Sequence, residues 1–152
     1  MNLCLKIFNP HKLYDSVLAP HILEHVDKSR NVISKVGTGV APGVSVIAVS
    51  PNAQSLHRQL AVSMGLKTSI DHLSPRDQLV EHQRVNTQDE LVEDFEAEGL
   101  IVEQRLGYFL KIVPKSTMRE WSSDLLIALT SISDSLPQNL VANNGIVARK
   151  VV

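Results

Sequence analysis

The sequence predicts an α/β fold in which helices flank a sheet. Residues 14–19 and 44–49 are apolar runs with the composition of buried strands. The segment between them has the length and apolar periodicity of a crossover helix, so the two strands should be parallel and their connection right-handed. No repeat, low-complexity tract or linker divides the 152 residues, which indicates one domain.

The first part of the chain holds an arm and the strand–helix–strand unit. Residues 1–8 alternate loosely between apolar and polar side chains, which indicates a short strand or an irregular arm. Pro20 interrupts the first strand, and apolar periodicity predicts a helix over residues 21–35. Two glycines weaken the end of that helix. Residues 44–49 (VSVIAV) are the clearest strand in the chain.

Three helices are predicted in the middle of the chain from capping and termination residues. Residues 55–64 carry an apolar helical stripe that a glycine ends. Ser74 at the N-cap, followed by a proline, starts a short helix. Thr87 and Glu90 form a capping box, and Gly99 follows the helix as its C′ glycine.

The last third of the chain predicts strands and one helix. Residues 100–106 and 108–113 are strand-like on either side of Gly107, which could mark a bulge or bend. A helix is predicted over residues 116–129 and a final strand over 146–148. We therefore expect an N-terminal arm (1–12), a strand–helix–strand core (13–52), a helical insertion (53–86) and a C-terminal helix and strands (87–152).

Composition limits the classes of partner. The chain has 15 basic and 16 acidic residues and 4% aromatic residues, which argues against nucleic-acid binding. It has no apolar run long enough to span a membrane and no signal-peptide pattern. Its single cysteine, Cys4, excludes an internal disulfide and fits a reducing cytoplasm, where we expect the protein to be located.

The segment from Tyr14 to Val26 resembles a known family. Its sequence, YDSVLAPHILEHV, is similar to YD-x-V-x-x-x-H-V-L-E-H-V around the fourth strand of Rossmann-like S-adenosylmethionine-dependent methyltransferases. Residues 41–43 stand where that family has an L-x-P-G-G turn, and residues 44–52 stand where it has its fifth strand and loop. Further ordered matches to one bacterial branch lie at residues 55–58, 77, 82–85, 87, 108–111 and 148–150.

The resemblance covers nearly the whole chain and implies the C-terminal strands of a partial methyltransferase sheet. It implies S-adenosylmethionine as the cofactor and a small molecule as the methyl acceptor. The sequence lacks the G-x-G-x-G cofactor loop and the acidic ribose anchor, and Val44 replaces the second glycine of the turn. We therefore predict that the isolated chain binds the cofactor weakly or not at all.

Three interpretations follow from the missing cofactor loop. The chain is a degenerate or truncated methyltransferase, half of a split enzyme that a second polypeptide completes, or a non-catalytic protein-interaction module on the same fold. The strand at residues 14–19 would have one unpaired edge. We therefore predict a homo-oligomer or a partner chain, with residues 1–8 and this edge at the contact.

The candidate site residues lie around the first predicted turn and in the insertion. By the resemblance, Ala19, Pro20 and His21 would border the cofactor; packing within the loop is the alternative. His21, Glu24 and His25 have a spacing that could place two imidazoles and a carboxylate on a divalent metal. We favour no metal here and a structural role, in which these side chains satisfy nearby polar groups.

The candidate catalytic bases are His57 and His82. By the resemblance, the insertion that contains them lies over the substrate pocket, where an imidazole could accept a proton from the nucleophile. The alternative is that both are solvated side chains on helix surfaces.

Overall fold

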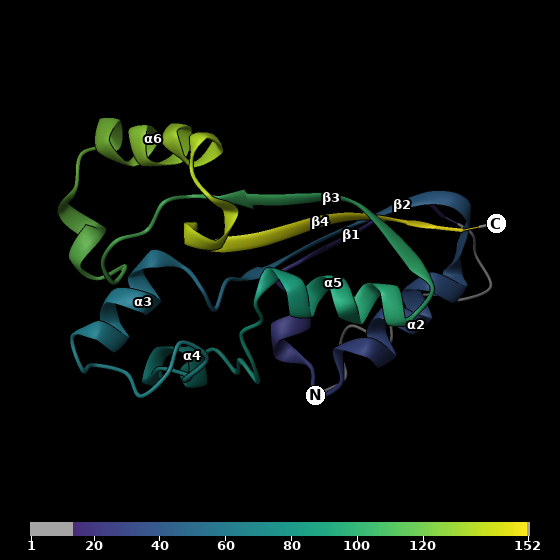
Figure 1. The fold of residues 1–152 in the computed structure, drawn as a ribbon, viewed down its shortest axis with the longest axis horizontal. Helices are drawn as coiled ribbons and strands as arrows, with labels where there is room; N and C mark the ends of the chain where they lie inside the picture. Colours follow the sequence, from purple (N-terminus) through teal and green to yellow (C-terminus); the bar gives the residue numbers. More distant parts are fainter. Residues whose placement is uncertain (1–13, 152) are drawn as a thin grey trace.

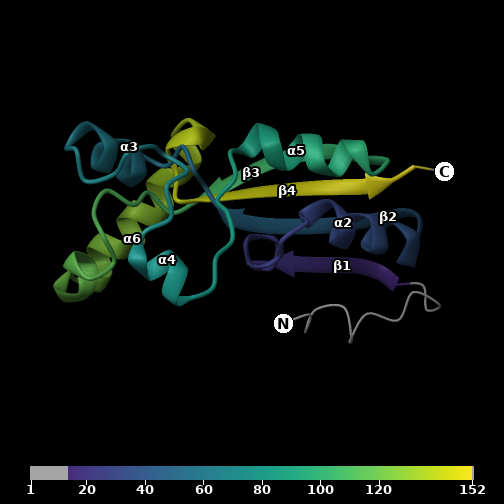
Figure 2. The ribbon, with the colours of Figure 1, turned by 90° about the horizontal axis from the view of Figure 1, so that it is seen from below.

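A computed structural model describes residues 14–151 and shows a four-stranded sheet with the order β1-β2-β4-β3 (Figures 1 and 2). β1 pairs in parallel with β2, whereas β4 runs antiparallel to both β2 and β3. The predicted sheet and its parallel first pair are confirmed. The predicted arm over residues 1–12 lies outside the described residues. The strands are β1 (Tyr14–Pro20), β2 (Val40–Pro51), β3 (Leu100–Tyr108) and β4 (Asn143–Lys150).

Helices connect the strands. Those assigned are η1 (Leu23–His25), α2 (Ser29–Gly39), α3 (Leu56–Ser63), α4 (Pro75–Leu79), α5 (Gln88–Ala97), η2 (Thr117–Glu120), α6 (Ser123–Ser131), η3 (Ile132–Ser135) and η4 (Gln138–Leu140). Helices α2 and α5 lie side by side against one face of the sheet (Figure 2). Ile33 and Phe95 from these helices are buried with Val46 and Ile146 from the sheet. Among residues 14–151, no helix is both long and apolar enough to cross a membrane.

The middle helices follow their capping residues. Ser74 and Thr87 each accept a hydrogen bond from the backbone N–H three residues later, at 3.1 and 3.2 Å. Gly99 follows α5 with a φ of 79°, the left-handed conformation expected of a C′ glycine. These predicted helices are confirmed. Their starts can be predicted from the sequence because capping depends on residues only three positions apart.

β1 differs from its predicted burial. Ala19 is buried, but Leu18 is 64% exposed and most of the other strand residues are exposed or half-buried. The prediction of a buried strand is wrong because β1 pairs with β2 alone among the described strands. A parallel strand is buried only when neighbouring strands and helices cover it on both sides.

The helix predicted over residues 21–35 begins later. His21 has a φ of 53°, which is incompatible with a right-handed helix. One short turn, η1, follows, and Val26 is extended, so α2 starts only at Ser29. α2 continues through its glycines because the helix is packed against α5 and β2, and this burial offsets the weak helix propensity.

The C-terminal predictions are wrong at two points. Residues 109–113 are not a strand; β3 ends where Phe109 takes a φ of 66°. The helix predicted over residues 116–129 is split into η2 and α6 by the extended residue Trp121. Ser122 then caps α6 by accepting a hydrogen bond from a backbone N–H of its first turn.

Gly107 serves a different purpose from the predicted bulge. The register shift of β3 lies between Val102 and Gln104 instead. A Cβ atom at Gly107 would collide with the side chains of Gln138 and Val141. The glycine therefore allows the segment before β4 to approach β3 closely.

We expect Gly107→Ala to lower the free energy of unfolding by about 1–3 kcal/mol through overpacking. Gly37→Ala is the matched control, because its Cβ would lie 3.9 Å from its neighbours. It should raise the stability by roughly 0.5–1 kcal/mol, the gain of alanine over glycine in a helix. Urea unfolding of both variants measures the difference, and equal stabilities would contradict this account.

Candidate functional site

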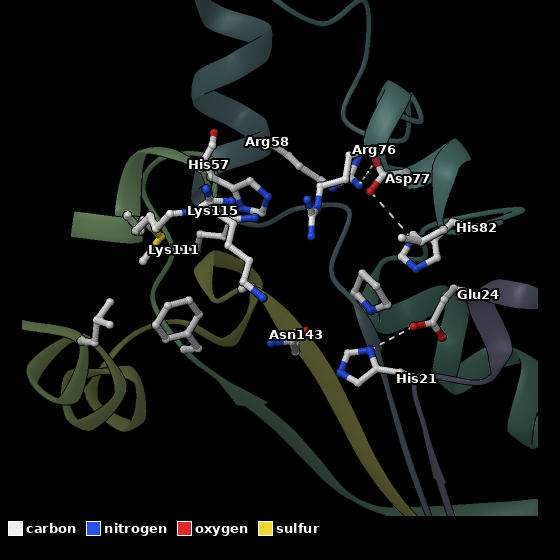
Figure 3. A pocket seen from close by; sticks show the side chains of 18 of the residues that line it. His21, Glu24, His57, Arg58, Arg76, Asp77, His82, Lys111, Lys115 and Asn143 are labelled. Atoms are coloured by element: carbon white, nitrogen blue, oxygen red, sulfur yellow. Dashed lines mark hydrogen bonds and ion pairs between the residues drawn. The ribbon is translucent and has the colours of Figure 1, made fainter. Parts of the chain in front are cut away.

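A cleft of about 920 Å³ opens at the carboxyl ends of β1 and β2. Open α/β sheets bind ligands at this position. Figure 3 shows two groups of labelled side chains, with His57 and two lysines on one side and His21, Glu24 and His82 on the other. The cleft is lined by His21, Glu24, His25, Pro51, His57, Arg58, Arg76, Asp77, Val80, His82, Phe109, Lys111, Lys115, Ser116, Met118, Arg119, Leu126, Ala142 and Asn143.

Of the three predicted cofactor residues at the end of β1 and in the turn after it, only one lines the cleft. Ala19 is buried in the core and Pro20 is exposed, and neither lines the cleft. His21 does line it, and its backbone N–H donates to the carbonyl of Val49 over 2.8 Å. This bond holds the turn against the end of β2.

His21 and Glu24 form the first polar contact of the site. Nδ1 of His21 lies 2.9 Å from Oε1 of Glu24, and its Nε2 lies 3.2 Å from the hydroxyl of Tyr108. The Glu24 side chain is 1% exposed, and its Oε2 has no hydrogen-bond partner among the described residues. Burial, and then the Glu24 carboxylate, raise the pKa of Tyr108. A buried carboxylate with an unpaired oxygen is poised to accept a donor or a cation.

His25 contacts His82 instead of joining His21 on one helical face. The two rings meet edge to face with centroids 4.7 Å apart. Glu24, His25 and His82 each offer a ligand atom within 4.8 Å of the others. This set could hold a divalent ion such as Zn²⁺, with His82 in the place of the predicted His21. Burial lowers the pKa of His82, which the Glu24 carboxylate opposes.

Arg58 and Asp77 tie α3 to α4 at the rim of the cleft. Arg58 is 4% exposed and donates to Oδ2 of Asp77 over 2.9 Å. It also donates to the backbone carbonyls of Ile70 and His72, at 3.2 and 3.0 Å. Burial raises the pKa of Asp77, but hydrogen bonds from Ser74 and from Arg58 outweigh it and leave this pKa below its usual range. Asp77 is therefore ionised and fixed.

Basic side chains surround His57 on the same side. Burial, then Lys111 and Arg58, lower the pKa of His57 to about 3, so its imidazole is neutral. Its Nδ1 is buried with no hydrogen-bond partner among residues 14–151. Burial, and next Arg58, also lower the pKa of Lys111.

Both predicted bases therefore line one cleft, but the sequence predicts no functional role for Lys111 and Lys115, which line it as well. Lys111 comes from a segment predicted as strand, and Lys115 lies between that strand and the next predicted helix. In the structure β3 ends at Tyr108, and both lysines line the cleft. The apolar residues around Lys111 did not distinguish these structures.

We expect Asp77→Asn to lower the free energy of unfolding at neutral pH by about 1–3 kcal/mol, because buried Arg58 loses its carboxylate partner. The folded-state pKa of Asp77 is depressed. Its stabilisation is therefore present above the unfolded value of about 4 and is lost as the pH falls through the folded pKa. Urea unfolding between about pH 7 and pH 3 should show the difference in unfolding free energy between the wild type and this variant becoming smaller as the pH falls. The substitution of exposed Asp15, Asp15→Asn, is the control. A difference between wild type and Asp77→Asn that does not depend on pH would contradict the stabilising role of ionised Asp77.

Three solved structures share this fold. An S-adenosylmethionine-dependent methyltransferase from Archaeoglobus fulgidus is 19% identical, with a TM-score of 0.52 over 97% of this chain and 63% of the other. An S-adenosylmethionine-dependent methyltransferase from Mesorhizobium loti is 11% identical, with a TM-score of 0.58 over 91% and 62%. Phosphoethanolamine N-methyltransferase 2 from Haemonchus contortus, in complex with S-adenosylhomocysteine, is 14% identical, with a TM-score of 0.52 over 91% and 34%.

The fold therefore matches part of the Rossmann-like methyltransferase fold. At these identities the likeness concerns the fold alone. The chain spans about three fifths of the length of the Archaeoglobus and Mesorhizobium proteins. No family model matches the sequence, and no curated protein matches it.

Proposed function

We propose that the chain forms the acceptor-binding part of an S-adenosylmethionine-dependent methyltransferase with a small-molecule acceptor. The observation that carries this proposal is the cleft at the carboxyl ends of β1 and β2, which charged side chains and imidazoles line. The cleft has a size suited to a small molecule, and His57, His82 and Glu24 all line it.

His82 suits the role of general base better than His57. Both imidazoles have a lowered pKa, but that of His57 is reduced to about 3, which makes it a weak proton acceptor at neutral pH. His82 Nδ1 lacks a hydrogen-bond partner among the described residues and lies 3.7 Å from Oδ1 of Asp77. The cofactor would supply the methyl group, and His82 would accept the proton that leaves the N–H or O–H of the acceptor.

Tight cofactor binding would need more than the 152 residues of this sequence. Of the predicted contacts only His21 lines the cleft, and the sequence has no Gly-rich loop. A longer chain or a second polypeptide would supply that loop. A non-catalytic interaction module is the alternative, and it predicts that the turn at His21 has no affinity for the cofactor.

Titration with the cofactor distinguishes these proposals. We expect calorimetry with S-adenosylmethionine and S-adenosylhomocysteine to show no binding tighter than about 10 μM, roughly 7 kcal/mol. NMR at millimolar cofactor should shift the amides of Ala19 and His21. His21→Asn, which tolerates the left-handed backbone, should abolish these shifts, whereas exposed His72→Asn should not. Tighter binding would show that this chain suffices for the cofactor, and no shift at all would favour the interaction module.

We also propose that β1 mediates association with a second copy of this chain or with a partner. Leu18 is exposed on β1, which pairs with β2 alone among the described strands, and such an edge strand can pair with another. Sedimentation at micromolar concentration should show a dimer or larger species. Leu18→Lys should shift the distribution of species towards monomer. Leu79 is exposed on α4, and Leu79→Lys should leave the distribution unchanged. A monomer with a cooperative melt would contradict association through β1.

A further inference from the structure

The charge of the cleft differs from that of the whole chain. Its lining has five cationic side chains and two carboxylates, although the chain has a net charge of −1. One of the carboxylates, Asp77, is bound by Arg58. The other four cations form no side-chain ion pair with any residue in the described part of the chain: Arg76, Lys111, Lys115 and Arg119.

The protein incurs an energetic cost for gathering these cations. Lys111 is partly buried, and both its burial and the nearby Arg58 disfavour its charged form. Burial lowers the pKa of His57, and the positive charges of Lys111 and Arg58 lower it further. Like charges in a partly desolvated cleft repel one another unless an anion offsets them.

His57 provides a hydrogen-bonding group at the same place. Its Nδ1 is buried without a partner among residues 14–151. A neutral imidazole has one nitrogen that donates and one that accepts, and a buried polar atom normally has a partner. An anionic ligand seated among these side chains would accept a hydrogen bond from the ring.

We propose that the basic half of the cleft, formed by His57, Arg76, Lys111 and Lys115, binds the phosphate group of a small phosphorylated molecule. A dianionic phosphate offers three oxygens to several cations at once, which a single carboxylate cannot do. The volume of the cleft suits a small molecule, and the low aromatic content offers little base stacking for a nucleic-acid strand.

The two halves of the cleft give this ligand a direction. Figure 3 shows His57 and Lys111 across the cavity from Glu24 and His82. A phosphate held by the basic half would point the rest of the molecule towards His82. The use of this phosphate as the anchor of a methyl acceptor rests on the proposed function, whereas phosphate binding itself does not.

The test uses the chain alone with inorganic phosphate and with glycerol 3-phosphate, at constant ionic strength. NMR titration at neutral pH should shift the ring resonances of His57 when either is bound, because the dianion accepts a hydrogen bond from the imidazole. Glycerol, which carries no charge, should cause no change. Lys111→Gln should weaken the binding of glycerol 3-phosphate about tenfold, and Lys35→Gln, exposed on α2, should leave it unchanged.

Equal weakening in the two variants, or no binding to wild-type protein, would overturn the proposal. Binding of succinate in preference to both phosphates would also overturn it and would assign a carboxylate ligand. Loss of structure in Lys111→Gln is detected by its amide spectrum, and exposed Lys115→Gln then provides the same comparison. Cofactor shifts at His21 without phosphate binding would refute this inference and leave the proposed function standing.

Discussion

Asn52 is the buried side chain on which the geometry of the cleft depends. It is fully buried just after β2, and its Nδ2 donates to the carbonyl of Val141 over 2.8 Å. Its backbone N–H donates to Ala142 over 2.9 Å, and its Oδ1 accepts from the N–H of Gln54 over 2.8 Å. One amide thus joins the end of β2 to the approach to β4. A buried amide without these partners would cost about 1–3 kcal/mol, so the segments that border the cleft are held together.

The two halves of the cleft have different physical origins. The half that contains His21 and Glu24 is fixed by the sheet, because the backbone of His21 is bonded to the end of β2. In the basic half, the positions of His57 and Arg76 depend on the cap of α4 and on the Arg58–Asp77 pair. One half therefore owes its position to strand pairing, and the other to a charged pair that is largely shielded from water.

Local chemistry could be predicted from the sequence, and long-range placement could not. The caps at Ser74 and Thr87 are confirmed because a cap requires only a neighbouring backbone N–H. The predictions of a helix start at His21 and of a strand after Gly107 are wrong. The left-handed conformations of His21 and Phe109 arise from tertiary contacts, which leave no pattern in the sequence. His82 was predicted as a base, but its contact with His25 joins segments far apart in the sequence.

The path of the chain after β3 has a consequence for how such a protein can diverge. Lys111 and Lys115 lie on a segment that belongs to no strand and contributes no residue to the central apolar cluster. Substitutions there can reverse the charge of the cleft without repacking α2 or α5. Ligand preference and fold stability are therefore encoded in largely separate parts of the sequence, and one can drift during evolution while the other is conserved.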